Sequence, residues 1–385
     1  MLKVFRFYEY RGLELVRGYL HYVWDKDGRR YVDAHTGHGV AFLGHSNPKV
    51  VRALAQQMSQ IMTVSPSFKA PIEDETIEVL DKIAPRSSNC VIFQNSGAEA
   101  VEVALKMAWA FTGRRRLVAF TGSFHGRTLG ALSVTWEPKY RAGFPTLEDV
   151  TFIKYNSSPE EIRDVFPRDA AAVIVEPIQG EGGLSVGSRP FLKSIEEMAR
   201  ETGALLIVDE IQCGFGRAGV NWVHEELGLK PDVVLAGKAI GGGFPVSLVF
   251  TREDVASSLL DGRHGSTYAS NPMALAAVKA SVEVYLEESV PEKVSSVSGR
   301  LWSRLESRVR GLGPVRGLRG RGLMVGVELR YPPAKVMRCL QERGVLSLRA
   351  GASVLRLLPP YTIDAETVDE VVDKIAECVC AEHGC

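Results

Sequence analysis

The stretches ALLIVDE (residues 204–210) and VVLAGKAIGGGFP (residues 233–245) decide the fold. Each opens with four or five apolar residues, and the runs lead into Asp209-Glu210 and Lys238 respectively. An apolar run without polar alternation is typical of a strand buried on both faces, as in a mostly parallel sheet covered by helices. Because the carboxyl ends of parallel strands meet at one edge of such a sheet, we expect Asp209 and Lys238 to project into the same crevice.

The same pattern repeats outward from these two stretches, between about residues 88 and 250. Further strands are predicted where short apolar runs occur, at 90–93, 116–120, 171–175 and 246–250. Helices are predicted between some of these runs, at 97–112 and 189–202, and each is followed by a glycine that can end it. Strands joined by helical crossovers predict a large α/β domain.

The flanking segments predict the rest of the organisation. The N-terminal part contains a predicted hairpin and the glycine-rich loop HTGHGVAFLGH (35–45), and the C-terminal part mixes helices with strands. We therefore predict an N-terminal segment at 1–46 that forms part of the small domain, a large domain at 47–285 and a smaller C-terminal α+β domain at 286–385.

Composition argues against several classes of function. The 385 residues include 46 Lys+Arg and 46 Asp+Glu, and a formal net charge of zero gives no basic field for nucleic acid or an anionic membrane. No apolar run approaches the roughly 18 residues needed to span a bilayer, and the N-terminus lacks the apolar core of a signal peptide. We expect a cytoplasmic protein that binds neither nucleic acids nor membranes.

The six cysteines suggest no framework of disulfides. Cys90, Cys213 and Cys339 are isolated in the sequence, and the tail CVCAEHGC (378–385) lacks the paired CxxC spacing of many metal sites. We interpret the tail as the frayed end of a terminal helix and predict no metal site.

Lys238 carries the strongest chemical signal. Gly237 precedes it and Gly241, Gly242 and Gly243 follow it, which clears space that a solvated surface lysine would not need. A lysine held in a cleft with a depressed pKa can form a Schiff base with a carbonyl. The cofactor that combines such a lysine with an acidic partner for its ring nitrogen is pyridoxal phosphate. Taken alone, the lysine would be interpreted as a surface charge at the end of a strand.

Pyridoxal phosphate also requires a phosphate site. The sequence QNSGAEA (94–100) follows a predicted strand and opens a predicted helix. Backbone N–H groups at a helix N-terminus, together with the helix dipole, bind phosphate without any formal charge. Gly97 allows the backbone to approach closely, so this turn is the predicted phosphate site.

Seven motifs in this order make the chain resemble the class III pyridoxal-phosphate aminotransferases, a fold type I family, over essentially its full length. The motifs are WDKDGRRYVD, NSGAEA, SFHGRT, VEPIQGEGG, VDEIQCGFGR, GKAIGGGFP and HGSTYASNP. Within the class, the spacing is most similar to the acetylornithine aminotransferase branch. HTGHGVAFLGH is similar to archaeal members that serve lysine and arginine synthesis with substrates attached to an amino-group carrier protein. The resemblance implies a mostly parallel α/β domain, a smaller α+β domain and a homodimer with a shared active site.

The resemblance also implies roles for individual residues. Lys238 matches the lysine that binds the cofactor, Asp209 the partner of the ring nitrogen, and Phe124 the aromatic side chain stacked on the ring. The other implied cofactor contacts are Ser96, Gly97, Ala98, Glu210, Ile211, Gln212 and Thr267, of which Thr267 would reach the phosphate in the neighbouring subunit. Many relatives have Thr at the place of Ala98, and its loss removes a hydroxyl but no backbone donor.

Four residues match substrate contacts of the family. Arg127 would bind the α-carboxylate, a task suited to a planar bidentate donor, and Ser266 would also contact the substrate. Glu181 and Arg356 would form a pair in which the glutamate covers the arginine while an ω-amine donor is bound and moves away for 2-oxoglutarate. Taken alone, either residue would be interpreted as an ordinary structural charge.

The resemblance therefore implies a pyridoxal-phosphate-dependent ω-aminotransferase. It would move the terminal amino group of an ornithine or lysine derivative, N-acetylated or carrier-linked, to 2-oxoglutarate and give a semialdehyde and glutamate. Alternatives with the same fold are an ornithine δ- or 4-aminobutyrate aminotransferase, an aminomutase, a racemase or a decarboxylase. Alternatives of another class are a nucleotide-binding protein, although the chain has no P-loop motif, and a non-catalytic binding module.

Overall fold

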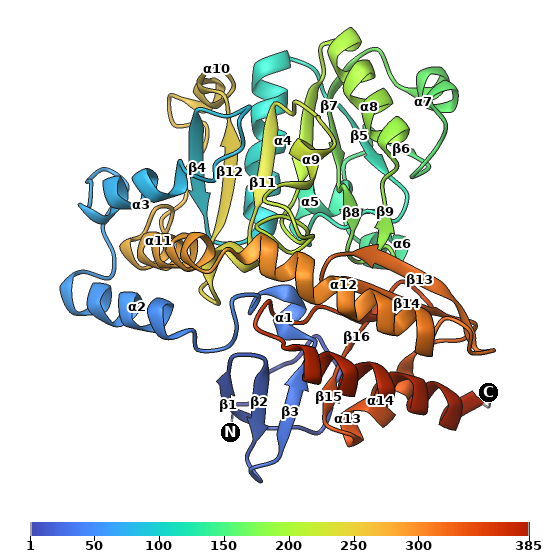
Figure 1. Cartoon of the computed structure of the whole chain (residues 1–385). Helices are drawn as coiled ribbons and strands as arrows, with labels where there is room; N and C mark the ends of the chain where they lie inside the picture. Colours follow the sequence, from blue (N-terminus) through green and yellow to red (C-terminus); the bar gives the residue numbers. More distant parts are fainter. Residues whose placement is uncertain (1, 384) are drawn as a thin grey trace.

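A seven-stranded sheet lies between layers of helices in the computed structural model, which describes residues 2–383 and 385 (Figure 1). The strand order is β4-β12-β11-β10-β7-β5-β6. The strands are β4 (Cys90–Gln94), β5 (Arg116–Phe120), β6 (Val150–Ile153), β7 (Ala170–Val175), β10 (Leu205–Asp209), β11 (Val233–Ala236) and β12 (Ser247–Thr251). Every residue of β7, β10, β11 and β12 is buried, as their uninterrupted apolar runs predicted.

The strand directions agree with the predicted mostly parallel sheet, with one exception. The strands from β11 across to β6 are parallel to one another. β12 runs antiparallel to both of its neighbours, β11 and β4. β6 is not among the predicted strands, because Thr151 interrupts the apolar residues of its sequence VTFI.

Helices cover both faces of the sheet because successive side chains of a strand point to opposite faces. Leu117 and Ala119 of β5 pack in one cluster with α4 (Gly97–Thr112), and Val118 and Phe120 pack in another with α8 (Arg189–Thr202). The other helices of this part are α2 (Pro48–Gln60), α3 (Ile72–Leu80), α5 (Leu129–Ser133), α6 (Pro138–Arg141), α7 (Pro159–Val165), α9 (Val223–Glu226), α10 (Glu253–Ala256) and α11 (Pro272–Glu287), with the short turns η1 (Lys238–Gly241) and η2 (Ser257–Leu259).

The two ends of the chain lie together below this sheet in Figure 1. The C-terminal part contains α12 (Val290–Arg308), α13 (Ala334–Glu342) and α14 (Ala365–His383), and an antiparallel sheet of β13 (Val315–Arg321), β14 (Met324–Leu329), β17 (Val354–Leu357) and β16 (Leu348–Ala350). The N-terminal strands β1 (Leu15–Tyr19), β2 (Tyr22–Asp25) and β3 (Arg30–Asp33) share a sheet with β15 (Val345–Leu346). This shared sheet supports the proposal that segment 1–46 belongs with the small domain 286–385, apart from the large domain 47–285.

The glycine-rich loop that follows β3 contains a single irregular turn, α1 (Thr36–Gly39). Thr36, Gly37, His38 and Gly39 all have positive φ angles, between 47° and 92°. Four consecutive residues in the left-handed region exclude a regular helix, in agreement with the loop that the glycines predicted. The buried side chain of Arg217 donates to the carbonyl of Gly39 at 3.0 Å and holds the turn in place.

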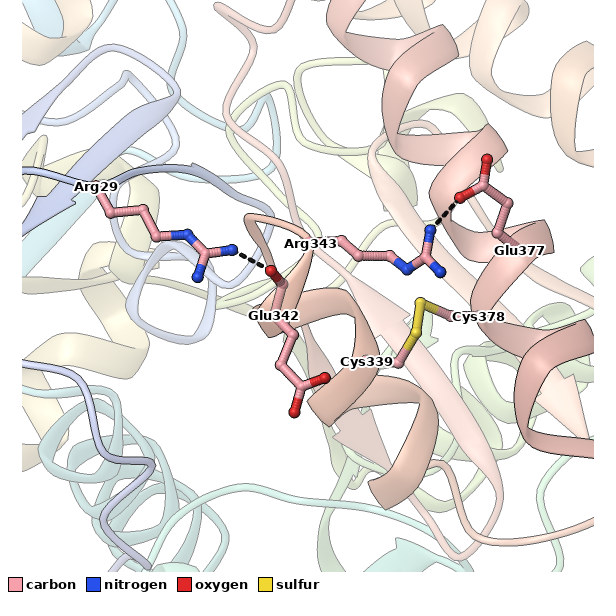
Figure 2. Close-up of a disulfide and its surroundings, with 6 residues drawn as sticks. All are labelled: Arg29, Cys339, Glu342, Arg343, Glu377 and Cys378. Atoms are coloured by element: carbon pink, nitrogen blue, oxygen red, sulfur yellow. Dashed lines mark hydrogen bonds and ion pairs between the residues drawn. A yellow bond between two sulfur atoms is a disulfide. The ribbon is translucent and has the colours of Figure 1, made fainter.

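Two disulfides correct the interpretation of the cysteines. Cys339 of α13 is bonded to Cys378 of α14, with their Cα atoms 5.7 Å apart (Figure 2), and Cys380 is bonded to Cys385. Cys339 is therefore not isolated, and the tail is more than a frayed helix end. Cys90 and Cys213 are free thiols.

Metal-binding clusters and membrane-spanning helices were sought within the described part of the chain. No group of side chains there could hold a metal ion. None of the helices described combines the length and the apolar character needed to cross a membrane.

The disulfide between α13 and α14 makes a prediction for stability. Cys339→Ser should lower the free energy of unfolding by about 4 kcal/mol, because the bond closes a 39-residue separation in the unfolded chain. Urea unfolding without a reductant measures this loss, and Cys90→Ser, which removes a free thiol, is the matched control. Equal stability of the two variants would contradict the disulfide.

Candidate active site

The carboxyl ends of β10 and β11 bring Asp209 and Lys238 to one edge of the sheet, as expected. β10 ends at Asp209, which pairs in register with Leu235 of β11, and Lys238 lies three residues further on, in η1. Asp209 is only 4% exposed. Lys238 has a φ of 47°, which is a strained conformation for a residue with a side chain.

The surroundings of Lys238 favour the neutral form of its amine. Burial lowers the pKa of Lys238, and the nearby carboxylates of Glu181 and Asp209 oppose this effect only in part. A neutral amine is the form that attacks a carbonyl. The structure therefore places an amine with a lowered pKa near the buried carboxylate of Asp209.

His125 is a site residue that the sequence analysis missed. Its Nδ1 lies 2.7 Å from Oδ2 of Asp209, and both side chains are buried. The backbone N–H of Ile211 donates to the other oxygen of Asp209 at 3.0 Å. His125 Nε2 is buried without a hydrogen-bond partner. Its place in the sequence could have indicated it, because His125 follows the predicted strand 116–120, whose carboxyl end lies at the same edge of the sheet as that of β10.

The turn that is predicted to bind phosphate lies at the start of α4. Ser96 caps the helix, and Glu99 accepts hydrogen bonds from the backbone N–H groups of Asn95 and Ser96 at 2.7 and 2.8 Å. The N–H groups of Gly97 and Ala98 lie in the first turn, where a helix provides no internal acceptor. They remain available to an anion at this end of the helix.

Gly97 lies closely packed at this turn. A Cβ atom at Gly97 would come within 3.1 Å of the Ile211 side chain, so Ile211 lies directly against the turn. Ser266 is nearby as well, since Asn95 donates to its hydroxyl at 3.3 Å. Thr267 is exposed beside it.

Glu181 and Arg356 form an ion pair, although they are far apart in the sequence. Nη1 of Arg356, on β17, donates to Glu181 at 2.7 Å and to the carbonyl of Gly180 at 2.9 Å. Gln212 Oε1 lies 3.4 Å from the same nitrogen. Arg356 is fully buried, whereas the Glu181 side chain is 28% exposed. Burial acts to raise the pKa of Glu181, but Arg356, Lys238 and His38 together outweigh it and the pKa is lowered.

A cavity of about 1150 Å³ lies next to this ion pair. Phe124, Glu181 and Arg356 line it together with His35 and His38 of the glycine-rich loop. Burial lowers the pKa of His35 to about 4 and also lowers that of His38. Both imidazoles are therefore neutral near pH 7, and Arg356 provides the buried positive charge in the wall.

The side chains of two implied site residues, Glu210 and Arg127, have partners of their own within the chain. The carboxylate of Glu210 accepts hydrogen bonds from the backbone N–H groups of Val223 and His224 at 2.9 and 2.8 Å, so its side chain is directed to α9 and not to the cofactor site. Arg127 is exposed and lies over the ring of Tyr140, 3.8 Å from its centroid. Tyr140 lines the cavity, so Arg127 contacts a residue of the cavity wall without lining the cavity itself.

The model of the class-III aminotransferase family matches residues 10–379. The chain belongs to the class-III aminotransferases. The LysW-aminoadipate semialdehyde/glutamate semialdehyde transaminase of Sulfurisphaera tokodaii is 47% identical to it over 96% of this chain and 95% of that protein. The acetylornithine aminotransferase of Methanosarcina mazei is 40% identical, over 97% and 93%. The ornithine aminotransferase of Toxoplasma gondii superimposes with a TM-score of 0.92 at 29% identity, over 98% and 93% of the two chains.

This aminotransferase is a pyridoxal-phosphate-dependent enzyme of fold type I, as the sequence predicted. Its site fits the cofactor in three respects. Asp209 is a buried carboxylate for the ring nitrogen, Lys238 is an amine with a lowered pKa, and the first turn of α4 has free N–H groups for the phosphate. Phe124, the aromatic residue that the resemblance assigns to the ring, lines the cavity together with Glu181 and Arg356.

Lys238→Ala should abolish turnover and the covalent attachment of the cofactor. Alanine has no amine, and Lys238 is the lysine that the fold places beside Asp209. Intact-mass measurement after borohydride treatment should detect cofactor fixed to the wild-type chain and none on the variant. Lys106→Ala, an exposed lysine of α4, is the control and should behave as wild type. An adduct on the Lys238 variant would show that another lysine does this chemistry.

Proposed function

We propose that the chain transfers the terminal amino group of an ornithine or lysine derivative to 2-oxoglutarate, giving a semialdehyde and glutamate. The observation that carries this proposal is the ion pair between Glu181 and Arg356 in the cavity wall. A fully buried guanidinium requires a carboxylate partner. Either Glu181 or a substrate carboxylate can serve, which suits a pocket that must accept two unlike substrates in turn.

The difference in burial decides which partner moves. Arg356 is fully buried on a strand, whereas Glu181 lies on a loop and is 28% exposed. While Glu181 is paired with Arg356, the charge of the arginine is neutralised and the pocket can accept the chain of an ω-amine donor. When Glu181 moves away, Arg356 is free to bind the second carboxylate of 2-oxoglutarate.

The residues at the sheet edge divide the chemistry among them. Pyridoxal phosphate, when bound, supplies an electrophilic carbon and a ring that takes up an electron pair. Lys238 Nζ acts as the general base that removes a proton from the amine-bearing carbon of the donor. Asp209, oriented by His125, provides the negative charge that favours a protonated ring nitrogen. The N–H groups of Gly97 and Ala98 bind the phosphate.

We propose that the physiological donor is attached to an amino-group carrier protein. The cavity lining includes Arg11, Lys139, Arg338 and Arg349, and the last three are exposed. Basic side chains at the mouth of a cavity favour a partner with an acidic surface. The names of the similar archaeal transaminases, which specify a LysW-linked substrate, support this choice over a free N-acetylated donor.

We also propose a cytoplasmic homodimer with shared active sites. Exposed apolar side chains gather on α2 and in the segment that follows it, namely Val51, Met58, Ile61, Met62 and Phe68. Exposed apolar groups of this kind are typical of protein–protein contact. In such a dimer, Thr267 would reach the phosphate in the neighbouring subunit, and Ser266 and Arg127 would contact the substrate.

Arg356→Ala should raise the KM for 2-oxoglutarate much more than the KM for the amine donor. The enzyme should lose about 2–5 kcal/mol of binding free energy for 2-oxoglutarate, the cost typical of a desolvated charge pair. Glu181→Ala should instead uncover the arginine and let glutamate compete as a donor. Stopped-flow measurements of the two half-reactions separate these effects, with the exposed arginine variant Arg319→Ala as the control. Equal slowing of both half-reactions in both variants would make the pair structural.

The carrier-linked substrate is tested by reversing charge at the cavity mouth. The double variant Arg338→Glu/Arg349→Glu should raise the KM for a carrier-linked donor by about tenfold or more and leave that for acetylornithine unchanged. Arg168→Glu, an exposed arginine outside the cavity lining, is the control. If wild-type enzyme prefers free acetylornithine, or if the double variant affects both donors equally, the carrier is not the substrate's partner.

Turnover that does not depend on 2-oxoglutarate would favour an aminomutase, a racemase or a decarboxylase.

A further inference from the structure

Glu176 is a buried carboxylate that connects two loops of the active site. It follows β7 directly and is 7% exposed. One oxygen accepts a hydrogen bond from the backbone N–H of Phe124 at 3.0 Å. The other accepts from the backbone N–H of Gly180 at 3.2 Å. The first belongs to the Phe124 loop (residues 121–128) and the second to the Glu181 loop (residues 179–183).

These two loops also pack directly against each other. Gln179 donates to the carbonyl of Thr121 at 2.8 Å. A Cβ atom at Gly182 would clash with the carbonyl oxygen of Gly122, so that glycine makes the close approach possible. Close packing transmits a displacement of one loop to the other.

The Glu181 loop continues this connection to the buried cation. The carbonyl of Gly180 accepts from Nη1 of Arg356 at 2.9 Å, and its N–H donates to Glu176. One peptide unit away, Glu181 forms the ion pair with the same nitrogen. The carboxylate of Glu176 is therefore linked at one end to the cation and at the other to the residue assigned to the cofactor ring.

A carboxylate is the side chain that this arrangement requires. Two backbone N–H groups from different loops converge on it, and each needs its own acceptor oxygen. A glutamine of equal length offers a single acceptor and would place an NH₂ group against the other N–H. The charge is unfavourable where it lies, because burial raises the pKa of Glu176 to about 7, His125 opposes the rise and Asp209 adds to it.

We propose that Glu176 is a positioning residue for the transamination, because it fixes the Phe124 loop and the Glu181 loop relative to each other. The position of Phe124 against the cofactor ring and the position of the Glu181 loop beside Arg356 then depend on the same side chain. This inference rests on the roles proposed above for Phe124 and Arg356. It goes beyond them in joining the two contacts through one side chain.

Glu176→Gln in the holoenzyme tests this inference with two readouts. The dissociation constant of the cofactor, followed by its visible circular dichroism, and the KM for 2-oxoglutarate should both rise by about tenfold, the effect expected from losing one hydrogen bond to a charged group. Asp25→Asn is the matched control, because Asp25 is also 7% exposed and accepts from two backbone N–H groups outside the site. It should leave both readouts within about twofold of wild type.

A change in only one readout, or in neither, overturns the inference, as does an equal change in the Asp25 control. If Glu176→Gln does not fold, Glu176→Asp replaces it in the test. The aspartate keeps both oxygens and the charge but is too short to reach both loops, so it should also raise both readouts. Phe124→Ala and Arg356→Ala test the underlying roles by themselves. If either leaves its own readout unchanged, the proposed function fails and the inference with it. If both respond and the Glu176 variants do not, only the inference fails.

Discussion

The constraint on which the site depends is a negative charge buried at the end of a parallel strand. The carboxylate of Asp209 is held there by hydrogen bonds on both oxygens, from His125 and from the N–H of Ile211. His125 can do so because parallel strands end at the same edge of the sheet. The same edge receives Lys238 from the neighbouring strand. One buried charge thus organises the loops that hold the cofactor.

A second buried charge joins the C-terminal sheet to the large α/β part. Arg356 lies on a strand of the C-terminal sheet, yet its partner Glu181 lies on a loop of the large α/β part. The two charges differ in what they allow. Asp209 is held on both oxygens by groups of its own domain, which favours a fixed position, whereas Glu181 is partly exposed and has room to leave. A fixed charge suits the cofactor, and a movable one suits the exchange of two substrates.

The sequence predicted those features that depend on local pattern. The buried strands and the proximity of Asp209 to Lys238 follow from apolar runs and from the rule that parallel strands end together. Glu181 and Arg356 came only from the resemblance, because no local pattern connects residues 175 positions apart. The direction of the Glu210 side chain toward α9 could not be read from the motif, although successive side chains of an extended chain point to opposite sides and Asp209 faces the site. The pairing of Cys339 with Cys378 depends on how two helices pack, which their own sequences do not reveal.

In the proposed function, Asp209 keeps the ring nitrogen of the cofactor protonated. The most direct test is the ¹⁵N NMR shift of that nitrogen in enzyme loaded with ring-labelled pyridoxal phosphate. The wild-type enzyme should give the shift of a protonated ring nitrogen across neutral pH, and Asp209→Asn should give that of an unprotonated one, because an amide carries no charge to hold the proton. An unprotonated ring in the wild-type enzyme, or a protonated ring in the variant, would contradict the account.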